Sequence, residues 1–388
     1  MIDIYRNELR DLESARRWKA RVHDWIWTEP NRFREIASKL AQDENNDLIA
    51  MGIYESLLLL EPESFEVLRF LGRISENMGK RERAYSYYSA ILSVSADDNE
   101  AKGYLQTHRK SRSWKGTSSL NLSDFQLICG KDAYPDIGLL ADSGESELCQ
   151  FVFGLVRKSI GERDMLEPVE PIAQGISFAN DILMSEGGVP IYLWRAGTYE
   201  VRAICGDDRR ILLGATSYRE PELGRVLFLA GRAIALNRLK RGYLQGITSR
   251  DLHNALHTLA GLISGQLESE EDVVVQDWLG RLRGVYEQTH PQDLIDSANR
   301  FLEVISLDDV RKWIRQELSR ANKLSLVFTG DIEEAKQALK LYYDSARVED
   351  SDVMLEAELE AEMADLVRFG TSELYYDIRE NIGCHLTK

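Results

Sequence analysis

Apolar residues recur at three- and four-residue spacing through most of the chain, and glycine and proline seldom interrupt them. This spacing gathers apolar side chains on one face of an α-helix. Short β-branched or aromatic runs stand out at 189–194 (VPIYLW), 199–205 (YEVRAIC) and 210–213, separated by glycine-containing turns. Such runs predict a small meander of antiparallel strands. We therefore expect a mainly α-helical fold with one small antiparallel sheet.

The helix expected directly after these strands is apolar on nearly every side. Pro221 and Glu222 are typical of a helix start, because proline suits the first turn and an acid suits the positive end of the helix dipole. The sequence from Leu223 to Ala235 then has few polar residues. A helix without a polar face is expected in the interior, so this one is predicted to be central and buried.

A register of about 34 residues repeats between residues 24 and 105. The first unit has Ala50, Tyr54, Leu57 and Pro62, where the second has Ala84, Tyr88, Ile91 and Ala96. This pattern resembles the tetratricopeptide repeat (TPR). The resemblance implies antiparallel helical hairpins, in which Gly72 and Ala84 allow close approach and Tyr88 fills the groove between neighbours. Two units are few for a solenoid, so an N-terminal helix with Trp18, Trp25 and Trp27 and the segment 99–108 are expected as caps.

A second resemblance lies at residues 222–233, which read ELGRVLFLAGRA. The framework is similar to E-L-x-x-V-L-x-H-E-x-x-H of gluzincins, a branch of the zincin metallopeptidases. Downstream, 318–322 (LSRAN) and 329–335 (TGDIEEA) resemble degenerate forms of that family's E-x-x-A-D motif and of the turn after it. The resemblance covers about 166–345 and implies an α+β zincin-like domain. The alternative is an unrelated core helix. A repeat joined to a degenerate peptidase is also similar to fusion proteins of deltaproteobacterial type.

The catalytic residues of that family are missing at the matched positions. Leu229 and Ala233 stand where the two zinc-binding histidines would be, and Ala230 replaces the general-base glutamate. The third ligand position is Leu318; Glu317 is next to it, but one residue turns a helical side chain by about 100°. The resemblance therefore implies that this site holds no zinc and activates no water. The sequence indicates no other cofactor.

One other pair of residues has metal-ligand spacing. His253 and His257 lie four residues apart on one predicted helix face. Asn254 stands beside the first histidine instead of glutamate, and no third ligand can be assigned, so a half-buried or surface pair is the default interpretation. The alternative function is a hydrolase or metal-dependent enzyme whose site assembles from dispersed residues that include these two histidines.

Charge and composition exclude some classes of function. The 388 residues carry a net charge of -16, which disfavours nucleic acid as the main ligand. No apolar run is long enough to span a membrane, and the N-terminus has no secretory apolar core. The four cysteines form no CxxC pair, so a cytoplasmic location is expected. Residues 349–365 carry eight acids and no base; they predict a solvated amphipathic helix or a docking surface for a basic partner.

These features predict a division of the chain into five parts: an N-terminal helix (1–28), TPR-like hairpins (29–107), a linker and an uncertain segment (108–165), the degenerate zincin-like domain (166–345) and an acidic helical segment (346–388). Residues 148–156 in the uncertain part fit either a buried strand or a core helix.

The function expected from the sequence is non-catalytic protein binding, as a scaffold or a regulatory subunit. The repeat would offer one face, and the cleft of a dead peptidase could hold an extended peptide against the sheet edge. Candidate contact residues for the protein partner are Tyr54, Tyr88, Tyr199 and Arg202.

Overall fold

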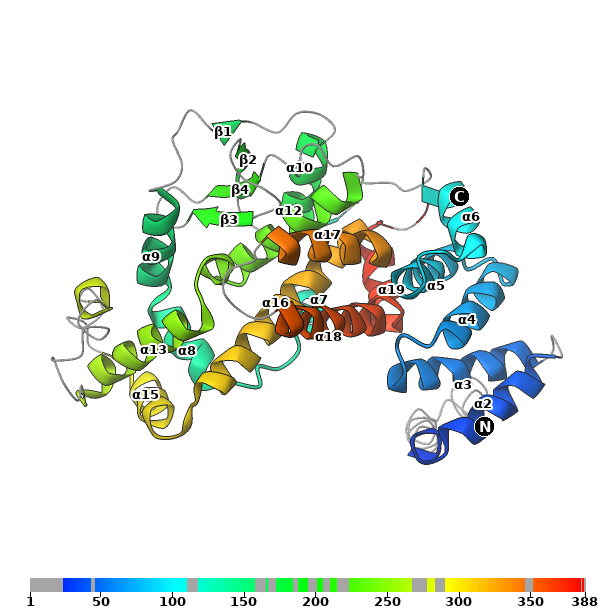
Figure 1. The fold of residues 1–388 in the computed structure, drawn as a ribbon, viewed down its shortest axis with the longest axis horizontal. Helices are drawn as coiled ribbons and strands as arrows, with labels where there is room; N and C mark the ends of the chain where they lie inside the picture. The colour runs from blue at the N-terminus through cyan, green and yellow to red at the C-terminus, as the bar shows by residue number, and fades with distance from the viewer. Residues whose placement is uncertain are drawn as a thin grey trace.

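Over the residues that the structure describes, the fold is mainly α-helical with a four-stranded sheet, which confirms the predicted mainly helical character (Figure 1). The structure is a computed structural model. The structure describes residues 24–42, 46–109, 118–157, 165–166, 172–183, 188–194, 201–204, 210–214, 223–266, 278–282, 290–345, 352–384 and 386.

The N-terminal part is a run of helices in which each packs against the next along the chain. They are α2 (Pro30–Leu40), α3 (Asp47–Leu60), α4 (Phe65–Asn77), α5 (Arg81–Val94) and α6 (Asn99–His108). A Cβ atom at Gly72 of α4 would lie only 3.2 Å from Cε1 of Tyr88 on α5. The predicted close approach at Gly72 is therefore confirmed, and Tyr88 fills the space beside it. The assignment of these hairpins to the TPR family stays a prediction.

The segment 108–165, whose structure the sequence did not predict, is mostly helical where the structure describes it. It contains α7 (Leu122–Cys129), α8 (Pro135–Ser143) and α9 (Glu145–Arg157), so residues 148–156 form a helix and not a strand. Asn121 caps α7 through its Oδ1 atom, which accepts a hydrogen bond from the backbone of Asp124 at 2.8 Å. Helix α8 begins with Pro135, which suits the first turn because its missing N–H would be unpaired there.

The sheet has the order β1-β2-β4-β3, so the predicted antiparallel meander is wrong. Its strands are β1 (Met165–Leu166), β2 (Ile191–Trp194), β3 (Val201–Ile204) and β4 (Arg210–Gly214). The central pair, β2 and β4, is parallel, and the outer pairs are antiparallel. Residues 211–213 of β4 are 0% exposed, and an apolar run of this kind fits an interior strand better than an edge. Helix α10 (Ile172–Leu183) lies between β1 and β2 in the chain.

The helices and strands that follow α6 are called the body. Helix α12 (Leu223–Arg238) is its central helix, as its apolar sequence predicted. Every residue from Val226 to Asn237 is buried. The helix packs against α10, α16, α17 and the sheet. The chain continues through the short 3-10 helix η5 (Gly242–Gln245), α13 (Ser249–Ser264), α15 (Gln292–Val304), α16 (Leu307–Thr329), α17 (Ile332–Ser345), α18 (Asp352–Gly370) and α19 (Glu373–Asn381).

Helices α12 and α16 approach each other closely at Gly231, where an added Cβ atom would lie 2.0 Å from Cε1 of the buried Phe328 ring. Alanine favours a helix over glycine, but the clash outweighs that gain, so Gly231→Ala should destabilise the fold by about 1–3 kcal/mol. Gly103→Ala is the matched control because Gly103 is also helical and has nothing within 4 Å of the added Cβ atom. Urea unfolding that finds both variants equally stable would contradict this prediction.

Helices α2–α6, called the repeat helices, share one hydrophobic core with the body. A single cluster of buried residues runs from α3, α4 and α5 into α12, α16 and α19, and α5 packs directly against α17. A second cluster lies between α8, α9, α13 and α15. In the described part of the chain, no helix has the length and apolar character needed to cross a membrane.

Candidate functional site

The four positions at which the sequence resemblance would place zincin catalytic residues lie on two helices that pack together, α12 and α16. Leu229, Ala230 and Ala233 are at most 1% exposed, and Leu318 packs against the same core. These side chains offer only hydrocarbon, whereas a metal needs nitrogen, oxygen or sulfur ligands. Glu317, the neighbour of Leu318, is buried and lies 3.5 Å from Nε of Arg241, so it is already paired.

His253 and His257 lie on one face of α13, with ring centroids 6.2 Å apart. His253 is half-buried against Phe301, and His257 is exposed. Burial lowers the pKa of His253, and the neighbouring His257 lowers it further. Among the described residues, no three histidine, cysteine or acidic side chains are grouped so that they could hold a metal. The pair therefore lacks a third described ligand.

Of the four residues proposed for partner contact, Tyr54 and Tyr88 are buried. Tyr54 is 7% exposed, with its ring 4.3 Å from Phe70. Tyr88 is 0% exposed, and its hydroxyl donates to Glu76 at 3.0 Å. Both rings belong to the interior of the helical array, which leaves little of either for a partner. Arg202 lies on β3, an edge strand of the sheet, and Tyr199 lies outside the described residues. A partner-binding role for these four residues stays a prediction.

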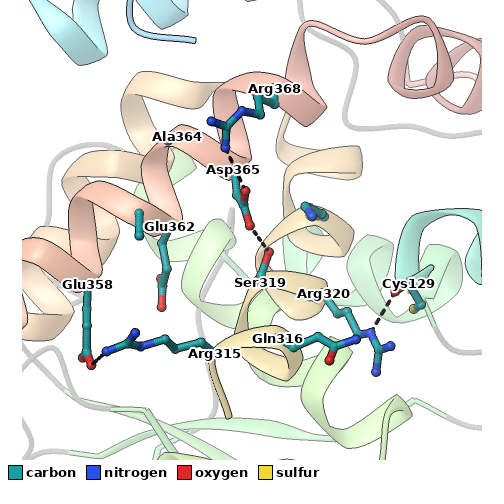
Figure 2. Close-up of a pocket in the computed structure, with 12 residues that line it drawn as sticks. Cys129, Arg315, Gln316, Ser319, Arg320, Glu358, Glu362, Ala364, Asp365 and Arg368 are labelled. Atoms are coloured by element: carbon teal, nitrogen blue, oxygen red, sulfur yellow. Dashed lines mark hydrogen bonds and ion pairs between the residues drawn. The ribbon is translucent and has the colours of Figure 1, made fainter. Parts of the chain in front are cut away.

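A pocket of about 630 Å³ between α7, α16 and α18 is the strongest candidate site (Figure 2). Its lining is mostly charged or polar: Cys129 from α7, then Arg315, Gln316, Ser319, Arg320 and Lys323 from α16, and Glu358, Ala361, Glu362, Ala364, Asp365 and Arg368 from α18.

Helical periodicity brings these side chains together. Arg315, Ser319 and Lys323 recur every four residues, which places them on one face of α16. Helix α16 is well defined at its start, where Ser306 and Asp309 cap each other's backbone N–H groups. Helix α18 packs against α16, with Leu366 and Val367 buried in the core. Its Glu358 and Asp365 side chains face α16.

Part of the acidic segment is therefore paired within the chain. Arg315 meets Glu358 at 2.8 Å, and Ser319 donates to Asp365 at 3.1 Å (Figure 2). Arg368 also contacts Asp365, at 3.3 Å. Glu358 and Asp365 thus form contacts within the chain, while both side chains stay partly exposed to solvent. One sequence signal for this pairing was missed: the basic residues of α16 recur on one helix face, as the acidic residues of α18 do.

The end of the pocket near α7 is held rigidly by Arg320. This side chain is 8% exposed; its Nε atom donates to the carbonyl of Cys129 at 2.8 Å, and its Nη1 atom pairs with Glu317. Burial raises the pKa of the Cys129 thiol to about 11, although Arg320 and Lys323 lower it. The thiol is therefore protonated at neutral pH, and a protonated thiol is a poor nucleophile.

A buried polar network supports the α18 side of the pocket. Glu362 accepts hydrogen bonds from Asn322 at 2.8 Å and from Tyr343 at 2.5 Å. Asn322 in turn accepts from Nε of Arg232 at 2.8 Å, and the Arg232 guanidinium lies over the Tyr342 ring. Burial raises the pKa of the Glu362 carboxyl, while Arg232 opposes that shift. The network thus holds the Glu362 side chain in place from the protein interior, and it joins α12, α16, α17 and α18.

No family model, curated protein or solved structure matches this chain.

Proposed function

We propose that this protein is a non-catalytic interaction protein, a scaffold or regulatory subunit, that binds a charged segment of a protein partner between α16 and α18. The observation that carries the proposal is the pocket itself: seven of its twelve lining residues are ionisable Arg, Lys, Asp or Glu, and all twelve lie on helices. Pre-formed concave sites with a few fixed polar groups are the usual places for ligands to bind.

Binding is favoured over catalysis because the reactive groups in this pocket are occupied or inactive. The Cys129 thiol is protonated at neutral pH, and Glu362 accepts two hydrogen bonds inside the chain. A general base or nucleophile would need a free, poised side chain facing the ligand. Charged groups held in fixed positions instead suit the recognition of a complementary charged segment.

The test is to fill the pocket. Ala361 lines the pocket and is exposed, so Ala361→Trp adds an indole ring there at little cost to the fold. The full-length protein and this variant would be measured by fluorescence anisotropy against labelled acidic, basic and mixed-charge octapeptides. We expect the wild-type protein to bind at least one class and the variant to bind that class at least about tenfold more weakly, a loss of about 1.4 kcal/mol.

Gly103→Ala on α6 is a suitable control because Gly103 lies on a repeat helix and is not among the residues that line the pocket. It should bind the same peptides as the wild-type protein. Equal peptide affinity in Ala361→Trp and the wild-type protein, or no binding of any class, would overturn the proposed function.

A further inference from the structure

We infer that the pocket between α16 and α18 selects an anionic group, a carboxylate or a phosphate, which binds at its α7 end beside Lys323 and Arg320. This inference rests on the proposed function and names the chemistry of the ligand. It follows from which charges in the lining are already compensated within the chain and which are not.

The carboxylates of the lining are all engaged by other side chains. Glu358 is paired with Arg315, and Asp365 accepts from Ser319 and Arg368. Glu362 has a donor on each oxygen atom, and the buried Arg232 lies behind it. A cationic ligand would therefore have to displace contacts that the protein already makes.

The cations of the lining outnumber these carboxylates. Arg315, Arg320, Lys323 and Arg368 carry four positive charges, against three negative charges on Glu358, Glu362 and Asp365. Arg315 and Arg368 pair with Glu358 and Asp365, and Arg320 pairs with Glu317 just outside the lining. In the described part of the chain, Lys323 has no ion pair, although it is half-buried. Partial burial of an ammonium group without a partner is unfavourable, and a bound anion would remove that cost.

The lining cation without an ion pair among the described residues, Lys323, lies one helical turn beyond Arg320 on α16. Arg320 contacts the carbonyl of Cys129 at 2.8 Å, and all three residues line the same pocket. Arg320 is held at its Nε and Nη1 atoms, so its guanidinium is already oriented before a ligand arrives. The neutral thiol of Cys129 adds no negative charge there. An oxyanion at this end would pair with Lys323 and lie beside Arg320, whose charge is balanced in part by Glu317.

This local charge is opposite in sign to that of the whole protein, whose net charge is -16. Long-range repulsion should slow the approach of an acidic partner, whereas contacts inside the pocket are screened much less than exposed ones. The anion is thus expected to be a discrete group on a partner, and not a large acidic surface.

The experiment compares Lys323→Gln with Lys312→Gln in the full-length protein. Lys312 lies on the same helix, is half exposed, pairs with Asp308 and is not among the residues that line the pocket. Both variants remove one positive charge from α16, so any difference between them belongs to the pocket. The probes are labelled hexaglutamate and hexalysine peptides, with inorganic phosphate as competitor at constant ionic strength.

We expect the wild-type protein and Lys312→Gln to bind hexaglutamate alike, and Lys323→Gln to bind it about tenfold or more weakly. Displacement of the peptide by phosphate identifies a site for oxyanions in general; resistance to phosphate identifies a carboxylate site. Equal affinity of Lys323→Gln and the wild-type protein for both anions overturns the inference. Binding of hexalysine in place of hexaglutamate, abolished by Ala361→Trp, would also overturn it while leaving the proposed function intact.

Discussion

Replacing Asp331 with alanine is expected to destabilise the protein by about 3–5 kcal/mol and to loosen the repeat helices from the body. Asp331 is 0% exposed and lies at the turn between α16 and α17. Its Oδ2 atom accepts from the hydroxyl of Tyr85 at 2.6 Å, and its Oδ1 atom accepts from Ser89 at 2.7 Å. Both donors lie on α5, so one carboxylate joins the repeat helices to the body.

The loss is expected to be large because the same carboxylate has two further functions. It accepts a hydrogen bond from the backbone N–H of Glu334 at 3.1 Å, which caps α17. It also pairs with Arg109 at 3.3 Å, just after α6. Alanine would leave the buried donors of Tyr85 and Ser89 without this acceptor, and an unpaired buried donor costs more than the bond itself contributed.

Urea unfolding and amide hydrogen exchange would measure the two effects. In Asp331→Ala, exchange should accelerate in α5 more than in α12. Tyr85→Phe removes one of the hydrogen bonds and should cost only about 0.5–1.5 kcal/mol. Asp97→Ala changes a fully exposed aspartate and should leave stability unchanged. A cost for Asp331→Ala no greater than that of Asp97→Ala would show that this carboxylate does not hold the two parts together.

Local patterns predicted the helices well because helix formation depends on neighbours along the chain. The apolar run of α12 indicated a buried central helix, and that is its place. The spacing of Gly72 and Tyr88 indicated a close helical hairpin, and the two residues are in contact. The sheet order was not predictable in this way, since β4 pairs with β2 across the intervening β3. Strand pairing is a long-range choice that alternating residues alone do not specify.

The candidate site escaped the sequence for a related reason. Arg315 and Glu358 are 43 residues apart and meet only because α18 folds back along α16. Asp331 was read as part of a degenerate peptidase turn, and its contacts with α5 span more than 240 residues of chain. Arg232, within an apolar helix, gave no sign of the buried network around it. Charged residues that contact each other across such distances have no local signature.

Replacing Arg232 with methionine is the second change expected to have a large effect, again about 3–5 kcal/mol of lost stability at neutral pH. Arg232 is 0% exposed, and methionine fills a similar volume without the charge. The variant leaves Asn322 without the donor at its Oδ1 atom and Glu362 without the nearby positive charge. A buried carboxylate that has lost its counter-charge is the main source of the expected cost.

This effect should depend on pH in a defined direction. Burial raises the pKa of Glu362 above its ordinary value of 4.5, so the folded state keeps a proton that the unfolded state releases. Protonated Glu362 therefore stabilises the fold fully at a pH below its ordinary pKa. This stabilisation is lost as the pH rises through the pKa of Glu362 in the folded state. Without Arg232, the pKa of Glu362 in the folded state rises further, so this stabilisation is lost over a range that extends to higher pH. The difference between Arg232→Met and the wild-type protein should therefore shrink from about pH 7 to about pH 5.

The double variant Arg232→Met/Glu362→Gln separates the charge from the packing. Glutamine is neutral and can still hydrogen-bond to Asn322 and Tyr343, so the double variant should be more stable at pH 7 than Arg232→Met alone and should lose most of the pH dependence. Urea unfolding between pH 5 and pH 7 gives both quantities for the three proteins. If the double variant is no more stable than the single one, the cost comes from lost packing and hydrogen bonding around Arg232, and its charge near Glu362 contributes little to the fold.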